Sequence, residues 1–305
     1  MITERHLDII KKEIVKLYHP TEAIRIFHGR YLEDLVLKQL VIESFPPLIE
    51  IRSYREIEGV EKILKILPPE TKLVYHQKRY HTRAQRVVLL GPPQEKMKAF
   101  ENSLTYELRF SEGQNIGFFL DSAEIRAYLL KNSQSKHILN LFSYTCSLSV
   151  AALKGGAKKV INIDLSKSSL EWGRKNHQIN HIDKKKSEFY SHNILKSFGF
   201  FRRKGPYDLI ILDPPSFQKN SFSFIKDYPK LIRKISPLLK EKGLLIVGLN
   251  EPKLCVDEVN EMVLSSGASL EFSFCLISPK GMKEPKGPVA KFLFYQSLIS
   301  SREGG

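Results

Sequence analysis

Residues 137–164, HILNLFSYTCSLSVAALKGGAKKVINID, decide the fold. The apolar run HILNLF predicts a strand, and SLSVAALKGGA predicts a helix that ends at the glycine pair Gly155 and Gly156. The next run, KVINID, predicts a second strand. A helix between two strands this close in sequence indicates a parallel pair joined by a crossover helix.

The alternation of helix and strand continues toward the C-terminus. Strand patterns follow at 187–193, 207–215 and 244–250, each after a helical pattern, whereas two last strand patterns at 270–278 and 290–299 have no helix between them. The alternation predicts a parallel sheet with helices on both faces, and the last pair predicts an antiparallel hairpin at its edge. The sequence therefore predicts an α/β, Rossmann-like domain with a seven-stranded sheet.

The chain before this sheet predicts a smaller N-terminal α+β domain. Leu7, Ile10, Ile14 and Leu17 recur at helical spacing, and we expect helix over about the first 35 residues. LIEIRSYREI, KLVYHQKRYH and RVVLLG then predict strands, and GVEKILKIL predicts a short helix. A Gly-Pro-Pro turn at 91–93 indicates a linker, so we expect one domain over residues 1–95 and a second, opening with a hairpin, over residues 96–305.

The net charge of +15 and the isoelectric point of about 9.5 favour a polyanionic partner, nucleic acid or an anionic membrane. Basic residues gather at 62–86, 184–186 and 202–204. In KLVYHQKRYHTRAQR, Tyr75 and Tyr80 alternate with cations, a pattern that suits single-stranded RNA. A solubility surface and an ordinary half-exposed strand are the alternatives for these two features.

Compartment and metal content follow from what the sequence lacks. No apolar run approaches the about 20 residues of a membrane span, and the N-terminus lacks a secretory signal, so we expect a cytoplasmic protein. Cys146, Cys255 and Cys275 show no paired spacing, so neither a disulfide framework nor a metal site is predicted.

Three predicted strands end in residues suited to a ligand, at the edge where doubly wound sheets bind theirs. The first turn, from Asn140, contains no glycine, which disfavours a nicotinamide dinucleotide because its pyrophosphate requires a glycine fingerprint. Asp164, after the second strand, can accept both hydrogens of a ribose diol; capping the next helix is the alternative.

The third strand is followed by Asp213-Pro214-Pro215-Ser216-Phe217. The prolines stiffen the loop and leave its carbonyls free to accept hydrogen bonds, and an aromatic ring can stack on a base. This loop is the sharpest functional signal in the chain.

These segments carry a family resemblance. The loop at 213–217 resembles a D-P-P-x-F motif, and Asn140-Leu141-Phe142-Ser143-Tyr144-Thr145 resembles N-x-F-S-Y-T. Residues 114–121 with Arg126 resemble a T-G-(F/L)-(F/Y)-L-D…R segment. All three belong to class I S-adenosylmethionine-dependent methyltransferases that modify large-subunit ribosomal RNA, a group with a cytosine-C5 and a guanine-N7 enzyme.

The resemblance implies that residues 96–305 form the methyltransferase domain, with S-adenosylmethionine as cofactor and RNA as partner. Two departures are Asn193, where the family often has Asp, and Cys146, which replaces a glycine. The resemblance implies catalysis by Asp213, Pro214, Pro215 and Phe217, and cofactor contacts by Asp121, Arg126, Asn140, Phe142, Ser143, Tyr144, Thr145, Asp164, Leu165, Ser166, Asn193 and Asp213.

The methylated atom is predicted from a missing cysteine. Carbon 5 of a pyrimidine must first be activated by a thiolate. The cytosine enzymes of the group carry that cysteine at the end of the fifth strand, which here ends Gly248-Leu249-Asn250. We therefore expect methylation of a base nitrogen in ribosomal RNA. Oxygen methylation, another RNA, a protein or small-molecule substrate, and a noncatalytic RNA-binding protein with a decayed cofactor site are the alternatives.

Overall fold

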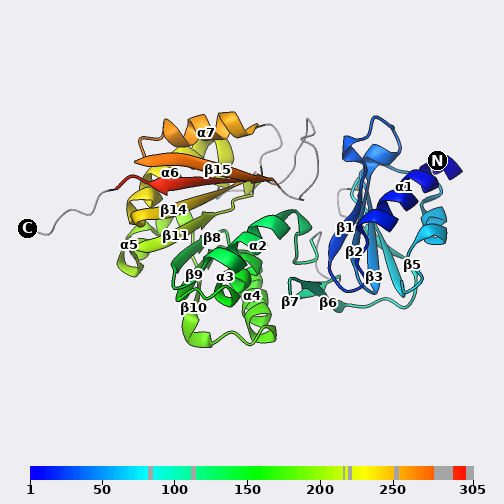
Figure 1. The fold of residues 1–305 in the computed structure, drawn as a ribbon, viewed down its shortest axis with the longest axis horizontal. Coiled ribbons are helices and arrows are strands. Elements are labelled where there is room, and N and C mark those ends of the chain that lie inside the picture. The colour runs from blue at the N-terminus through cyan, green and yellow to red at the C-terminus, as the bar shows by residue number, and fades with distance from the viewer. Residues whose placement is uncertain are drawn as a thin grey trace, which may run out of the picture. The chain divides into compact units, whose positions relative to one another are not determined.

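The computed structural model describes residues 1–81, 85–110, 115–215, 217–218, 222–250, 254–277 and 291–299. These residues form two compact units, Met1–Leu120 and Asp121–Gly305 (Figure 1). The β6–β7 hairpin, Lys96–Glu101 and Leu104–Arg109, belongs to the first unit. The division between residues 95 and 96 stays a prediction about where the chain separates functionally.

The second unit is built on the predicted seven-stranded sheet. Its strand order is β10-β9-β8-β11-β14-β16-β15, and β16 is the one strand that runs opposite to the other six. The α/β fold class and the antiparallel pair at one edge are thereby confirmed, with β16 inserted between β14 and β15. The strands are β8 His137–Leu141, β9 Lys159–Asp164, β10 Ser187–Ser191, β11 Tyr207–Leu212, β14 Leu239–Leu249, β15 Leu270–Ile277 and β16 Lys291–Ser297.

Helices cover both faces of this sheet, as Figure 1 shows. Because both faces are buried, strands such as YDLIIL are apolar along nearly their whole length. On one face Leu139, Ile161 and Ile210 pack with Leu231 of α6 and Val259 of α7 in one core. The helices are α2 Ala123–Asn132, α3 Ser147–Lys154, α4 Lys167–Ile179, α5 Phe198–Lys204, α6 Phe224–Ile235 and α7 Val256–Leu264.

The first unit holds a five-stranded sheet, β1 to β5 in order, in which only β3 and β4 are parallel. The prediction of helix over the first 35 residues is wrong beyond Leu17, and the short helix at 59–67 is a 3-10 helix, Val60–Ile66. The elements are α1 Glu4–Leu17, β1 Ile24–His28, β2 Leu40–Phe45, β3 Leu48–Ser53, β4 Leu73–Lys78 and β5 Gln85–Leu90.

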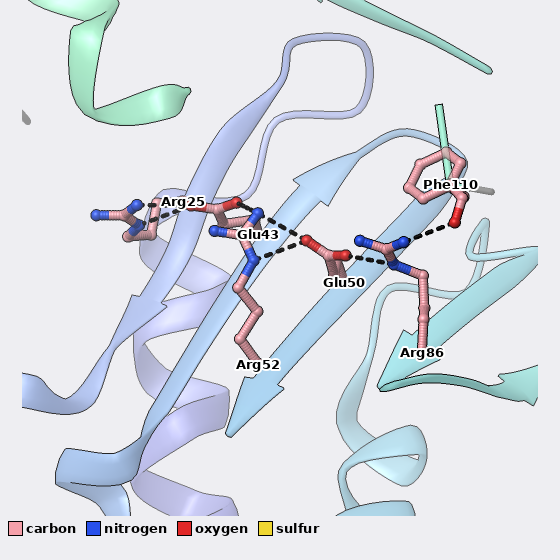
Figure 2. A network of polar contacts seen from close by, with 6 residues as sticks. All are labelled: Arg25, Glu43, Glu50, Arg52, Arg86 and Phe110. Atoms are coloured by element: carbon pink, nitrogen blue, oxygen red, sulfur yellow. Dashed lines mark hydrogen bonds and ion pairs between the residues drawn. The ribbon is translucent and has the colours of Figure 1, made fainter. Parts of the chain in front are cut away.

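A ladder of buried charges crosses one face of this sheet (Figure 2). Glu43 on β2 lies 2.6 Å from both Arg25 and Arg52, and Glu50 lies 2.6 Å from Arg52 and 3.0 Å from Arg86. Burial alone would raise the pKa of Glu50, but the charges of Arg52 and Arg86 hold it below its usual value. The Glu50 carboxylate therefore remains ionised inside the domain.

The ladder also ties the β6–β7 region to the sheet. The Arg86 guanidinium donates through Nη1 to the Phe110 carbonyl at 2.7 Å, and Phe110 stacks on Tyr75. The Tyr75 hydroxyl in turn donates to the Gln94 carbonyl at 2.9 Å. Charge pairing and aromatic packing thus fix the hairpin within the first unit.

Candidate active site

The carboxyl ends of four neighbouring parallel strands form the candidate site in the second unit. In register, Leu141 of β8 lies opposite Ile163 of β9 and Leu212 of β11, and Leu212 lies opposite Val247 of β14. The turn after β8, Asp164 at the end of β9, and Asp213 just after β11 therefore emerge at one edge of the sheet. The sequence predicted this convergence, and the backbone provides it.

The turn after β8 has an unusual backbone. Phe142, Tyr144 and Cys146 have φ of 57°, 46° and 61°, the left-handed region. A residue with a Cβ pays about 1–2 kcal/mol there relative to the right-handed region. The amide of Ser143 compensates by donating to the Ile163 carbonyl at 3.0 Å. The turn is thus held against β9 without a glycine.

Asp164, at the end of β9, holds this turn through its carboxylate. Its Oδ2 accepts a hydrogen bond from the Tyr144 amide at 2.8 Å, and its Oδ1 accepts one from the Ser166 amide at 2.8 Å. Burial raises the pKa of Asp164, and these backbone donors oppose the shift. The Leu165 amide is a third backbone donor to this carboxylate, which has about four acceptor sites, so it is oriented and can still accept from a diol.

Asp213 lies just beyond β11, half-buried. Burial raises the pKa of its carboxyl to about 6, while a hydrogen bond from Asn250 lowers it. The Asn250 Nδ2 donates to Asp213 Oδ1 at 2.6 Å and to the Pro214 carbonyl at 2.9 Å. The group can therefore exchange a proton near neutral pH.

Three other predicted residues lie close after the strands β9 and β10 in the chain. Leu165 is 45% exposed directly beyond Asp164. Ser166 caps α4, where its Oγ accepts from the Ser169 amide at 3.1 Å. Asn193 precedes a 3-10 helix and its carbonyl accepts from Ser197 at 2.8 Å. These residues surround the end of β9 and leave the side chain of Leu165 accessible.

Buried members of the predicted set lie deeper. Asn140 points toward β9, where its Nδ2 donates to Asn162 Oδ1 at 3.0 Å. The Thr145 carbonyl accepts from Asn176 of α4 at 3.0 Å. Ser143 is 8% exposed, and Arg126 of α2 is 1% exposed. Asp121 lies in the 3-10 helix Leu120–Ser122, which precedes α2.

Parts of the predicted motifs fall outside the described residues. These are Ser216 of the proline loop and Gln114 of the upstream segment. Phe217 begins the short strand β12, Phe217–Gln218, which pairs with β13, Phe222–Ser223; its side chain is outside the described part. The base-stacking role of Phe217 therefore stays a prediction.

Sequence reasoning missed Gly248 and Asn250. A Cβ at Gly248 would clash with the Asp213 carboxylate, so the glycine makes room for that carboxylate over β14. Their place at the end of a core strand was visible in the sequence. Their partner Asp213, however, follows β11 and lies 37 positions before Asn250, so the pairing depends on the fold.

The cysteines are also located. Cys146 is fully buried, and a Cβ on Gly173 of α4 would lie 2.5 Å from its Sγ. Its thiol therefore fills the space opposite that glycine. Cys255 is exposed at the start of α7, and Cys275 is half-buried on β15.

The described residues contain neither a metal-ligand cluster nor a membrane-spanning helix. No group of three or more His, Cys, Asp or Glu side chains there could hold a metal ion. No helix in the same residues is both long and apolar enough to cross a bilayer.

A seven-stranded sheet with one antiparallel strand, an oriented carboxylate after the second strand and no glycine fingerprint define a nucleoside-cofactor enzyme of the Rossmann-like type. The sequence profile of the S-adenosylmethionine-dependent methyltransferases matches residues 27–293. The chain belongs to this family, and S-adenosylmethionine is its cofactor.

Several relatives are similar over most of the chain. Ribosomal RNA large subunit methyltransferase I of Aeromonas salmonicida is 30% identical over 248 residues, 75% of this chain and 63% of that protein. Methyltransferase K/L of Alteromonas mediterranea is 31% identical over 72% of this chain and 32% of its own length. The chain thus spans less than two thirds of these relatives.

Solved structures give the same result for the fold. The structure of SMU.776, provisionally assigned as a methyltransferase and complexed with SAH, matches with a TM-score of 0.84 and 25% identity, over 96% of this chain and 79% of that one. A methyltransferase structure from Streptococcus mutans matches with a TM-score of 0.81 at 24% identity, over 95% and 81% of the two chains.

Proposed function

We propose that this methyltransferase transfers its methyl group to a base nitrogen in ribosomal RNA. The observation that carries the proposal is the Asp213 carboxylate, fixed at the strand edge with its pKa raised to about 6. The names of the relatives, which are ribosomal RNA methyltransferases, support the substrate class. The charge of +15 supports an RNA partner, because phosphates dominate such binding.

The cofactor side of the proposal rests on Asp164. Its carboxylate, held by the Tyr144 and Ser166 amides, would accept the ribose hydroxyls of the cofactor. Leu165 would pack on the adenine, and Phe142, Ser143 and Tyr144 would line the methionine part. When bound, S-adenosylmethionine supplies an electrophilic methyl group on its sulfonium.

On the substrate side, Asp213 and the Pro214 carbonyl would accept hydrogen bonds from the N–H groups of the target base. A base nitrogen with a lone pair needs in-line positioning and an acceptor for any departing proton. An Asp whose pKa is raised to about 6 is ionised at neutral pH and can accept that proton. Phe217 would stack on the base, and Pro215 would keep the loop stiff.

The described cysteines favour nitrogen over carbon 5. Burial raises the pKa of the Cys146 thiol far above neutrality, so it is a poor nucleophile. Its Sγ also faces Gly173 of α4. Cys275 lies within the edge strand β15, away from the ends of β8, β9 and β11, and Cys255 caps α7. None follows β14 directly.

RNA contacts by the N-terminal domain, residues 1–95, complete the proposal. After β4, the rings of Tyr80 and His81 lie 4.5 Å apart. Arg30 lies 4.0 Å above the ring of Tyr54 in the same unit. Aromatic and cationic groups of this kind bind single-stranded nucleic acid.

The test is methyl transfer from labelled cofactor to total RNA of a deletion strain, followed by nucleoside analysis. We expect label in an N-methylated base, and Asp213→Ala should abolish transfer while the protein stays folded. Asp208→Asn, at the opposite end of the same strand, is the matched control and should retain transfer. Label in a C5-methylated base would refute the nitrogen assignment, and label in protein instead of RNA would refute the substrate class.

Calorimetry separates an enzyme from a protein with a decayed cofactor site. We expect S-adenosylmethionine to bind the wild-type protein. The absence of any heat of binding, with RNA binding intact, would support a noncatalytic RNA-binding role instead.

A further inference from the structure

One asparagine joins two acceptors of the proline loop. Asn250 follows the last residue of β14, and its Nδ2 lies 2.6 Å from Asp213 Oδ1 and 2.9 Å from the Pro214 carbonyl oxygen. A carboxamide nitrogen carries two hydrogens, so each contact takes one of them. Both contacts reach groups that emerge from the neighbouring strand β11.

We propose that Asn250 is a positioning residue for methyl transfer, which sets the orientation of the Asp213 carboxylate and the Pro214 carbonyl toward the substrate. The proposal deepens the function proposed above, because it assigns Asn250 to the same site.

The geometry of the loop explains why one donor is sufficient. Pro214 has a fixed φ, so the backbone between the Asp213 side chain and the Pro214 carbonyl has few free rotations. Holding both ends from one nitrogen removes most of the remaining freedom. Gly248 contributes from the same strand, since any Cβ there would displace the Asp213 carboxylate. The remaining oxygen of Asp213 is then presented in a defined direction.

The contact also has an electrostatic consequence. Burial disfavours the ionised form of Asp213, and the hydrogen bond from Asn250 favours it. Among the described residues, the titratable group that interacts with Asp213 is Tyr228 of α6, and burial raises the pKa of its phenol, so it is neutral at assay pH. Within the described part of the chain, Asn250 is therefore the donor that favours the ionised form of Asp213.

The first test is the pH dependence of kcat for Asn250→Ala and Asn250→Asp. Loss of a hydrogen bond to a charged group should move the acid limb up by about one pH unit in Asn250→Ala. The shift should be larger in Asn250→Asp, where a second carboxylate repels the first. Asn132→Ala is the matched control, because the Asn132 amide also donates to a carbonyl, that of Tyr128, outside the site. Its acid limb should not move.

A second test needs no substrate. Thermal unfolding of Asn250→Ala is compared with the wild-type protein from pH 4 to 8 and again in an Asp213→Asn background. The destabilisation should grow as Asp213 ionises, and this growth should vanish when Asp213 is Asn. A purely structural role would give the same loss at every pH in both backgrounds.

The outcomes distinguish the two proposals. If the wild-type protein transfers no methyl group to RNA but the unfolding experiment behaves as expected, the substrate proposal fails and the contact of Asn250 with Asp213 stands. If wild-type transfer is normal and neither the acid limb nor the pH-dependent part of unfolding changes in Asn250→Ala, the positioning role is overturned.

Discussion

Replacing Asp213 by Asn should make the protein more stable and inactive at the same time. The side chain keeps its shape and its Oδ1, so the hydrogen bond from Asn250 survives, and only the charge is removed. Burial raises the pKa of Asp213 from 3.8 to about 6, and two pKa units correspond to about 3 kcal/mol. Because the side chain is half-buried and partly screened by water, we expect about 1–2 kcal/mol.

The sign of the pH dependence follows from proton binding. Below pH 3.8 the group is protonated in the folded and the unfolded protein, so the wild-type protein carries no penalty. Between pH 3.8 and about 6 the folded state binds more protons than the unfolded state, so wild-type stability falls as pH rises. Above about pH 6 the penalty is complete. The gain from Asp213→Asn should therefore be absent in acid and full at neutral pH.

Thermal unfolding between pH 4 and 8 measures this gain. For a domain of this size, about 1–2 kcal/mol corresponds to a Tm increase of about 2–8 °C at pH 7.5. Asp208→Asn is a control of opposite sign. Although burial alone would raise the pKa of Asp208, bonds from Lys240 and the His137 amide hold it below 3.8. That variant should lose stability at neutral pH. Equal Tm values for wild-type and Asp213→Asn protein at every pH would refute the reasoning.

Three further predictions concern binding and packing. Asp164→Ala should weaken S-adenosylmethionine binding at least about tenfold, since the charge-assisted contacts proposed between this carboxylate and the two ribose hydroxyls are lost. Unchanged affinity in calorimetry would contradict the role of Asp164. Gly173→Ala should lower the free energy of unfolding by about 1–3 kcal/mol, because the new methyl group overpacks against the Cys146 thiol. Adding Cys146→Gly should restore most of that stability, as measured by denaturant unfolding. Additive losses in the double variant would count against the contact. Glu50→Ala should destabilise the N-terminal unit by about 3–5 kcal/mol, because the buried Arg86 guanidinium loses its carboxylate partner and Arg52 keeps only Glu43. A change under about 1 kcal/mol in urea unfolding would show that water compensates the buried charge of Arg86.

The sequence was sufficient for the catalytic domain where apolar strands are buried on both faces. Apolar composition, followed by polar residues, was sufficient to predict the strands in residues 137–164 and the strand before Asp213. The strand β1 lies in the stretch that was predicted to be helical. The strand β2 was missed because it carries Glu43 inside a buried segment, and burial of a carboxylate depends on partners such as Arg25 and Arg52 from other strands. Such pairing is a property of the fold and leaves no local pattern.

The candidate site shows the same division. Asp164 and Asp213 were predicted because their positions after strands have a known meaning in doubly wound sheets. Asn250 was not predicted, since its two partners lie in another loop. The left-handed backbone of Phe142 and Tyr144 was not predicted either, because glycine is the residue expected at positive φ.

Three side chains held at positive φ make the turn at 142–146 unfavourable for a free peptide. The turn owes its shape to α4 and β9, through the contacts of Thr145 with Asn176 and of Tyr144 with Asp164. Local loosening of α4 would therefore release the turn before the sheet melts. Cofactor affinity should accordingly decline during heating ahead of the main unfolding transition, so ligand release reports on the integrity of this helix.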